Sequence, residues 1–292
     1  MAIIVDETSR ILIQGITGPT GRSYAERMVQ DGTPLVGGVA PGRQGQSIAG
    51  VPVFDSVEDA VAATGADAAL SAVRSALALG AALEALSAGI RTLVVYTENV
   101  PLHDAIRMRA YARACGARLL GPNSAGAISP GKANLADLNG SNLRSGRIGI
   151  VSKSGTLTYE VIDDLQTRGY GASSIVCLGG DPVIGTTYAD VLPLFEADNQ
   201  TDLVVLIGEP GGRLEYEAIS ATRRMKKPVV AYIAAQNAPP EKRMGHAGAI
   251  YDSGDTSAAA KLAAFRAAGC EAVGRVTEVV TAVERALQRA AA

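Results

Sequence analysis

The chain has no tryptophan, and aromatic residues make up only 4% of its 292 residues. Such a small supply of flat side chains argues against a surface on which nucleic-acid bases would stack. The net charge is -2 and no long run of one sign occurs, so no nucleic-acid or membrane partner is indicated. No apolar run is long enough to span a bilayer, and we therefore expect no membrane segment.

Cysteine is also scarce. Cys115, Cys177 and Cys270 are odd in number, lie far apart and have no metal-type spacing. We therefore expect reduced thiols in a cytoplasmic protein and no metal site. The first seven residues carry no basic region and include Asp6 and Glu7, so we expect no signal peptide.

The chain is rich in glycine, with 33 residues, and in short apolar runs that alternate with helical patterns. In the first half we predict strands at 10–14, 34–39, 51–54, 68–73, 92–96 and 118–120, and helices at 23–30, 57–63, 76–88 and 104–115. Strands that alternate with helices indicate parallel βαβ units and a doubly wound sheet, so we predict an α/β fold.

The alternation stops at 121–147, where proline, glycine and asparagine cluster, and resumes at Ile148. In the second half we predict strands at 148–151, 174–178, 203–207 and 229–233, and helices at 156–168, 188–196, 214–224, 256–268 and 276–289. The expected organisation is one domain at 1–122, a linker at 123–146 and a second domain at 147–292.

A glycine-rich loop, 15–21, follows the first predicted strand and opens a helix. Glycines allow a tight turn there, and the unpaired N–H groups of a helix N-terminus attract phosphate. A nicotinamide fingerprint also needs an acid near the end of the second strand, but 39–43 holds none and ends in Arg43. Arg43 could bind a phosphate with two hydrogen bonds, although an arginine in a solvated loop fits as well. The pattern favours a phosphate-rich ligand over NAD.

A second loop of this type, Ser154-Gly155-Thr156, follows the first strand of the second half. Read alone, it fits an ordinary N-cap and an anion site equally. Glu209 ends another strand, where a carboxylate can point into the usual crevice of an α/β sheet or simply lie in solvent.

His246 is one of only two histidines and lies among small residues at 245–250. Its imidazole has an unperturbed pKa near neutrality, so a ring nitrogen is available as a nucleophile at pH 7. A structural histidine is the plainer interpretation of a lone residue. Two phosphate-type loops and Glu209 favour the nucleophile, with Glu209 holding Nδ1 and leaving Nε2 free.

Taken in order, these loops resemble one family over nearly the whole chain. The segments that carry the resemblance are 15–21, 41–43, 96–98, 121–123, 152–157, 179–182, 208–209 and 245–250. The chain is similar to the α subunits of succinyl-CoA synthetases, acid-thiol ligases that include malate-CoA ligases. The resemblance implies an N-terminal Rossmann-like CoA-binding domain followed by a flavodoxin-like ligase domain.

By the same resemblance, His246 is phosphorylated on Nε2 while Glu209 holds the other ring nitrogen. The residues expected to line coenzyme A are Thr17, Gly18, Pro19, Thr20, Arg43, Tyr96, Thr97 and Glu98. Tyr159, Asn123 and Ser124 belong to the substrate region, and Ser154, Gly155 and Thr156 aim a helix N-terminus at the phosphohistidine.

The resemblance also implies a partner, an ATP-grasp β subunit in an αβ or α2β2 assembly. That subunit binds ATP or GTP with Mg²⁺, and the reaction, a step of the tricarboxylic acid cycle, makes a CoA thioester of a small dicarboxylic acid. Two other classes remain to be weighed: a non-catalytic CoA-binding regulatory protein on the same fold, and a nicotinamide oxidoreductase.

Three departures from the family pattern concern the acid. The family usually has Cys-Pro where this chain has Ser124-Ala125, and Ile where it has Pro210. A fourth departure, Arg43 where the family usually has Lys, lies among the residues expected to line coenzyme A and does not concern the acid. A site built to bond a substrate hydroxyl can reject the analogue without it by up to ~10⁴-fold. These changes therefore fit either a preference for a hydroxy acid or an unchanged succinate pocket.

Overall fold

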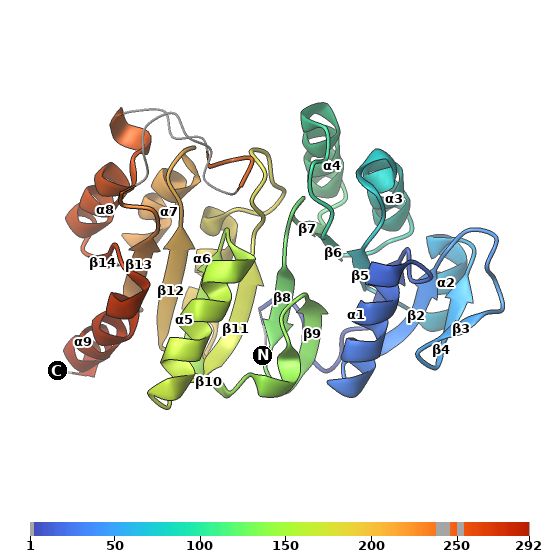
Figure 1. Cartoon of the computed structure of the whole chain (residues 1–292), viewed down its shortest axis with the longest axis horizontal. Coiled ribbons are helices and arrows are strands. Elements are labelled where there is room, and N and C mark those ends of the chain that lie inside the picture. The colour runs from blue at the N-terminus through green and yellow to red at the C-terminus, as the bar shows by residue number, and fades with distance from the viewer. Residues whose placement is uncertain (1–2, 238–245, 250–253, 292) are drawn as a thin grey trace. The chain divides into compact units, whose positions relative to one another are not determined.

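The computed structural model describes residues 3–237, 246–249 and 254–291, and within it the chain forms two compact units (Figure 1). The first comprises Ile4–Asn142 with Val183–Gly185, and the second comprises the described residues of 143–182 and 186–291. None of the described helices has both the length and the hydropathy that crossing a bilayer requires.

The sheet of the first unit has the order β3-β4-β2-β1-β5-β6-β7. All its pairings are parallel except that of β3 with β4. Its strands are β1 (Ile11–Gln14), β2 (Leu35–Val39), β3 (Ser47–Ile48), β4 (Val51–Phe54), β5 (Ala68–Ser71), β6 (Thr92–Val95) and β7 (Arg118–Leu120). Numbered along the chain, the parallel strands run 3-2-1-4-5-6, the Rossmann order.

Four helices cover this sheet: α1 (Pro19–Gln30), α2 (Val57–Thr64), α3 (Ser75–Ser87) and α4 (Leu102–Ala114). Helices α2, α3 and α4 pack in a row, and their alanine-rich faces meet Leu12, Leu93 and Leu119 of the sheet in one apolar core. Helix α1 begins at Pro19, four residues before the predicted start. Gly18 is its N-cap, and proline suits the first helical position because the N–H that it lacks would have no partner there.

The expected linker at 123–146 is not an irregular segment. It contains a hairpin of two antiparallel strands, β8 (Gly126–Ser129) and β9 (Ala133–Ala136). Pro130 and Gly131 form its turn: Gly131 has a φ of 75°, and the N–H of Lys132 donates to the carbonyl of Ser129 at 3.0 Å. Proline followed by glycine with positive φ is the pattern of a type II turn. Pro130 and Gly131, which suggested a linker, therefore belong to a hairpin of the first unit.

The parallel sheet of the second unit runs β14-β13-β12-β10-β11. Its strands are β10 (Ser145–Ser152), β11 (Ala172–Cys177), β12 (Leu203–Gly208), β13 (Val229–Ile233) and β14 (Glu271–Val273). From β11 to β14 the spatial order is 2-1-3-4-5, that of flavodoxin-like folds. Both halves thus confirm the predicted α/β class, although sequence analysis missed the short strands β3 and β14.

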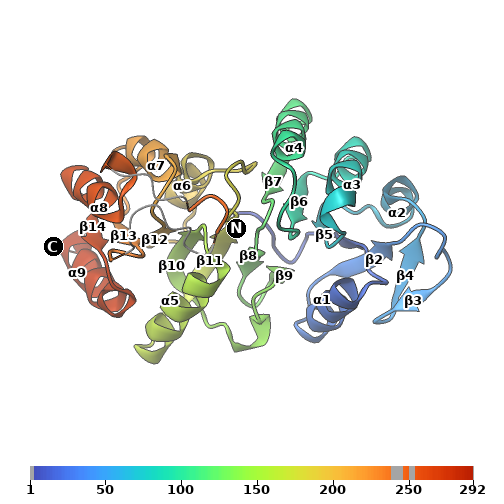
Figure 2. The ribbon, with the colours of Figure 1, turned by 45° about the horizontal axis from the view of Figure 1, so that its top comes forward.

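Helices α5 (Gly155–Thr167) and α9 (Val279–Ala291) pack together, and α5 lies over β10 (Figures 1 and 2). Helices α6 (Tyr188–Ala197), α7 (Leu214–Thr222) and α8 (Ala258–Ala267) pack in a row. Helix α9 shows why such helices dock: Val279, Val280, Val283 and Ala286 recur at helical spacing and are buried.

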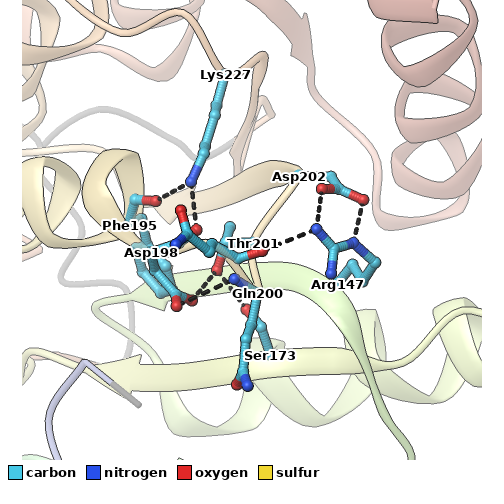
Figure 3. A network of polar contacts seen from close by, with 9 residues as sticks. Arg147, Ser173, Phe195, Asp198, Gln200, Thr201, Asp202 and Lys227 are labelled. Carbon is cyan, nitrogen blue, oxygen red and sulfur yellow. Dashed lines mark hydrogen bonds and ion pairs between the residues drawn. The ribbon is translucent and has the colours of Figure 1, made fainter. Parts of the chain in front are cut away.

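A polar network fastens the amino ends of β10 and β12 (Figure 3). The guanidinium of Arg147 donates from Nε and Nη2 to the two carboxylate oxygens of Asp202, at 2.5 and 2.6 Å. Lys227 Nζ donates to the carbonyls of Phe195 and Asp198, and Thr201 donates to the carboxylate of Asp198. Each charged side chain drawn in Figure 3 has a partner within the chain, so we interpret the network as structural: it holds the amino ends of these strands together.

Candidate active site

The opposite edge of the second sheet gathers the residues singled out by sequence. Ser154 follows β10 and Glu209 follows β12, and these neighbouring strands flank the point where the strand order reverses. In open α/β sheets, ligands bind at this switch point beyond the carboxyl ends of the strands. The fold thus places both residues where a site is expected.

His246 and Glu209 are in direct contact. Nδ1 of the imidazole lies 2.7 Å from one carboxylate oxygen of Glu209 and 2.9 Å from the other. An ionised carboxylate can only accept, so Nδ1 carries the proton and the neutral ring has its lone pair on Nε2. The ring is 25% exposed while the Glu209 side chain is 8% exposed, so a buried carboxylate orients an accessible imidazole.

Two glycines make room for this ring. A Cβ on Gly180 would lie 2.6 Å from Cγ of His246, and one on Gly248 would lie 3.0 Å from the carbonyl oxygen of Gly180. The N–H of Gly248 donates to that carbonyl at 3.0 Å. The small residues at 247–249 therefore let the loop approach the turn after β11 closely. Gly245 and Ile250 lie outside the described residues.

The N-terminus of α5 reaches the same place. Ser154 is its N-cap and accepts from the N–H of Leu157 at 3.3 Å, so the ordinary capping role is real. The amides of Gly155 and Thr156 belong to the first turn, where helical N–H groups have no acceptor within the helix. Capping and anion binding are therefore compatible at this terminus.

A pocket of about 380 Å³ joins these elements. Its lining residues are Ser154, Thr156, Leu157, Glu209, Pro210, Ala234, Ala235 and His246. The helix terminus, with its positive dipole end, and the imidazole thus face one space, which suits an anionic group on the ring. Tyr159 also lies on α5, further along the helix, and is 41% exposed.

Three charges act on the imidazole. The hydrogen bond to Glu209 raises the pKa of His246 above its ordinary value, against the opposing effect of burial. The positive charge of Lys153 lowers this pKa and the negative charge of Asp181 raises it. Lys153 is 3% exposed and was not picked out by sequence reasoning, yet a cation beside the ring favours an anion bound there.

A second buried group was also missed. Lys261 and Glu215 form an ion pair with both side chains 0% exposed. Lys261 comes from α8 and Glu215 from α7, and both bind the backbone of Glu209. A lysine or glutamate in a helical pattern is ordinarily interpreted as a surface residue, so no local sequence signal marks this buried pair.

In the first unit, the residues expected to line coenzyme A follow the carboxyl ends of β1, β2 and β6. Thr17 and Gly18 end the turn that follows β1, and Pro19 and Thr20 begin α1. Gly15 has a φ of 79°, and a Cβ on Gly21 would lie 2.3 Å from the carbonyl oxygen of Gly15. Only glycine fits there, so the helix N-terminus starts directly at the strand end, as in phosphate-binding turns.

Arg43 is exposed, and a carboxylate holds its loop. The N–H groups of Arg43 and Gln44 both donate to Oδ1 of Asp55, at 2.8 and 2.9 Å. Asp55 directly follows β4, so sequence order did not connect it with Arg43. The carboxylate fixes the backbone of the turn and leaves the guanidinium in solvent.

Tyr96, Thr97 and Glu98 follow β6, and the N–H of Asn123 donates to the carbonyl of Thr97 at 2.9 Å. Asn123 therefore lies beside the expected coenzyme segment. Ser124 is 1% exposed, and its Oγ accepts from the N–H of Gly126 at 2.9 Å. This hydroxyl thus has a role within its own turn, whatever it contributes to a substrate.

The sequence predicts no metal site in either unit. Among the described residues, no cluster of three or more His, Cys, Asp or Glu side chains has the arrangement that a metal ion needs.

Two known protein families match this chain, one in each half. Residues 151–270 match the CoA-ligase family and residues 6–99 match the CoA binding domain family. A succinate–CoA ligase [ADP-forming] subunit alpha 1 from Archaeoglobus fulgidus is 45% identical over 99% of both chains. The corresponding subunit from Staphylococcus epidermidis is 38% identical over 99% of this chain and 96% of its own.

The chain belongs to the family of succinate–CoA ligase alpha subunits. The resemblance inferred from the loops is thereby confirmed, as are the Rossmann-like coenzyme-binding part and the acid-thiol ligase class. Nothing in the family favours the non-catalytic alternative.

The fold of this family is also seen in longer chains. An ATP citrate lyase from Methanosaeta concilii, solved with (3S)-citryl-CoA, superposes with a TM-score of 0.89 at 24% identity. The match covers 97% of this chain and 50% of the lyase chain, so this chain spans half the length of that protein. At this identity the likeness concerns the fold alone.

Proposed function

We propose that this chain is the phosphohistidine subunit of a nucleotide-dependent acid–CoA ligase and that His246 carries the phosphoryl group. The observation that carries the proposal is the 2.7 Å contact between Nδ1 of His246 and Glu209, beside the N-terminus of α5. The contact leaves Nε2 as the nucleophile, and the nearby helix amides suit the negative charge of a phosphoryl group on that nitrogen.

The chemistry divides into three steps. The lone pair of Nε2 attacks the γ-phosphorus, the bond to the bridging oxygen breaks, and the nucleoside diphosphate leaves. A carboxylate oxygen of the acid then takes the phosphoryl group and the imidazole is restored. Finally the thiol of coenzyme A, losing its proton, attacks the acyl carbon and phosphate leaves with the electron pair.

The partner and cofactors follow from the class of reaction. The alpha-subunit names of the relatives support a β subunit, for which we propose an ATP-grasp fold that holds ATP or GTP with Mg²⁺. In the first unit, Thr17–Thr20, Arg43 and Tyr96–Glu98 are the proposed coenzyme A contacts. A cytoplasmic location and an αβ or α2β2 assembly complete the proposal.

The proposed acid is a small dicarboxylate, with succinate first and malate or a related hydroxy acid next. Tyr159, Asn123 and Ser124 are the proposed contacts. Pro210 also bears on the choice of acid, because it lines the His246 pocket and has no N–H to donate there. The ratio of kcat/KM for succinate and malate, measured for the native chain and for Ser124→Cys, tests whether the Ser124 turn selects the acid. A preference of the native enzyme for acetate would overturn the dicarboxylate assignment.

The phosphoryl carrier is tested by labelling. The complex reconstituted with its β subunit is incubated with nucleotide labelled at the γ-phosphate, and the α subunit is examined for acid-labile label. We expect label on the native chain and none on His246→Asn. His103→Asn is the matched control, since it removes the other histidine from the exposed start of α4 and should label normally. Acid-labile label that persists in His246→Asn would contradict the assignment.

A further inference from the structure

The buried pair Lys261–Glu215 holds both backbone polar groups of Glu209. Nζ of Lys261 donates to the carbonyl of Glu209 at 2.8 Å and to Oε2 of Glu215 at 2.6 Å. The other oxygen of Glu215 accepts from the N–H of Glu209 at 3.2 Å. The third bond from Nζ goes to the carbonyl of Gly211 at 2.5 Å, so all three ammonium protons have acceptors.

The segment that this pair holds needs outside support. Gly211 and Gly212 come two and three residues after Glu209, beyond Pro210, and have φ values of 82° and 60°. Glycines have wide conformational freedom, so this part of the loop does not by itself hold the peptide groups of Glu209 in place. The pair ties this segment to α7 and α8 at once.

Stability alone is a weak reason for such a pair. Taking two charges out of water is costly, and well-packed apolar residues in their place are often as stable. What apolar residues could not supply is a donor for the carbonyl of Glu209 and an acceptor for its N–H. The special contribution of the pair is therefore the placement of Glu209.

We propose that Lys261 and Glu215 are positioning residues for His246: they fix the peptide groups of Glu209 so that its carboxylate stays on Nδ1. Neither residue touches the imidazole. Their effect on the ring does not depend on phosphorylation, whereas its consequence for phosphoryl transfer rests on the proposed function.

The charges around the two groups define what must be kept constant in a test. His246 faces Glu209, Asp181 and Lys153, and Lys261 faces Glu215, Glu209 and Lys153. The double variant Lys261→Met/Glu215→Leu removes one charge of each sign and replaces the pair with apolar side chains. It therefore leaves the net charge unchanged and avoids an uncompensated buried ion.

The readout is the imidazole itself in the resting protein. With only two histidines in the chain, ring ¹⁵N spectra give the tautomer and titration of His246 directly. We expect the Nδ1–H tautomer in the native chain, and in the double variant a mixture of tautomers and a pKa shifted down toward the ordinary value. We also expect phosphorylation to slow by about 10²-fold, the usual effect of misplacing a reacting group by about 1 Å.

Arg147→Met/Asp202→Leu is the matched control, because it removes an opposite-charge pair from the other edge of the same sheet. It should leave the tautomer, the titration and the phosphorylation rate unchanged. A folded Lys261→Met/Glu215→Leu chain with native tautomer and titration would overturn the proposal.

Two further outcomes are also decisive. In the first, the ring spectra of the native chain and the double variant differ as expected while the native chain is never phosphorylated. That result would refute the proposed function and retain the positioning role. If the double variant does not fold, Glu215→Gln, which keeps the shape and one acceptor oxygen, should show a smaller shift of the titration in the same direction; no shift would overturn the proposal.

Discussion

The two edges of the second sheet hold similar side chains in opposite circumstances. At the amino edge, Arg147 and Asp202 are 56% and 45% exposed and bind each other through two hydrogen bonds (Figure 3). At the carboxyl edge, Lys261 and Glu215 are 0% exposed and bind the backbone of Glu209. The first pair faces water, whereas the second lies beneath the candidate active site.

This difference shows how burial turns an ion pair into a positioning device. An exposed pair is screened by solvent and contributes little to folding. A buried pair must satisfy every donor and acceptor that it brings in, and in doing so it fixes the geometry of whatever backbone it binds. At the carboxyl edge this rigidity acts on Glu209, the residue that contacts the imidazole of His246.

The largest expected effect comes from breaking the buried pair on one side only. Lys261→Met leaves the Glu215 carboxylate buried without its cation, which typically costs about 3–5 kcal/mol. Urea unfolding of the chain should show this loss, and Lys261→Met/Glu215→Leu should recover most of it. A Lys261→Met chain as stable as the native protein would contradict the assigned burial.

Gly180→Ala attacks the site without touching a charge. The new Cβ would lie 2.6 Å from the imidazole, so the ring or the β11 turn has to move. We expect at least ~10²-fold slower phosphorylation with a folded chain. Gly80→Ala is the control and should keep full activity, because Gly80 is exposed on α3 and the new methyl would meet nothing within 4 Å beyond its own turn of helix.

Glu209→Gln tests the contact with His246 through the pH dependence of phosphorylation. The Glu209 hydrogen bond raises the pKa of His246, and a protonated ring has no lone pair on Nε2, so phosphorylation should fall as the pH drops through this raised pKa. Removing the carboxylate lowers the pKa and moves this acid limb to lower pH. We expect up to ~10²-fold slower phosphorylation at neutral pH and a smaller deficit at acid pH. An acid limb that stays in place would show that another group controls it.

The smallest effect is expected at the amino edge. Arg147→Met/Asp202→Leu should shift the melting temperature by less than about 3 °C, because exposed pairs contribute little. Scanning calorimetry measures the shift, and the same samples serve the labelling assay. A large loss of stability here would remove the contrast between the two edges.

Much of this structure is readable from sequence because its signals are local. Apolar runs alternating with helical patterns predicted both sheets, and the glycine loop at 15–21 and the capping loop at 154–156 lie where strands end. The hairpin at 126–136 was missed because Pro130 and Gly131 suit a linker and a type II turn equally. Strand β14 was missed because its three residues, Glu271-Ala272-Val273, contain only one β-branched residue and form no apolar run.

The buried parts of the candidate site are not readable in this way. Lys153 and Lys261 are buried only because helices and strands distant in sequence pack around them. Asp55 reaches the Arg43 loop across strand pairing, twelve residues away along the chain. These contacts depend on tertiary packing, and a single sequence carries no local pattern for them.

Identifying the atom that bears the phosphoryl group tests the roles of His246 and Glu209 together. The complex made with ring-¹⁵N-labelled chain is phosphorylated and examined by ³¹P and ¹⁵N NMR, so that coupling identifies the bonded nitrogen. With Glu209 on Nδ1, we expect phosphorus on Nε2 of His246. Phosphorus bonded to Nδ1, or to any residue other than His246, would contradict it.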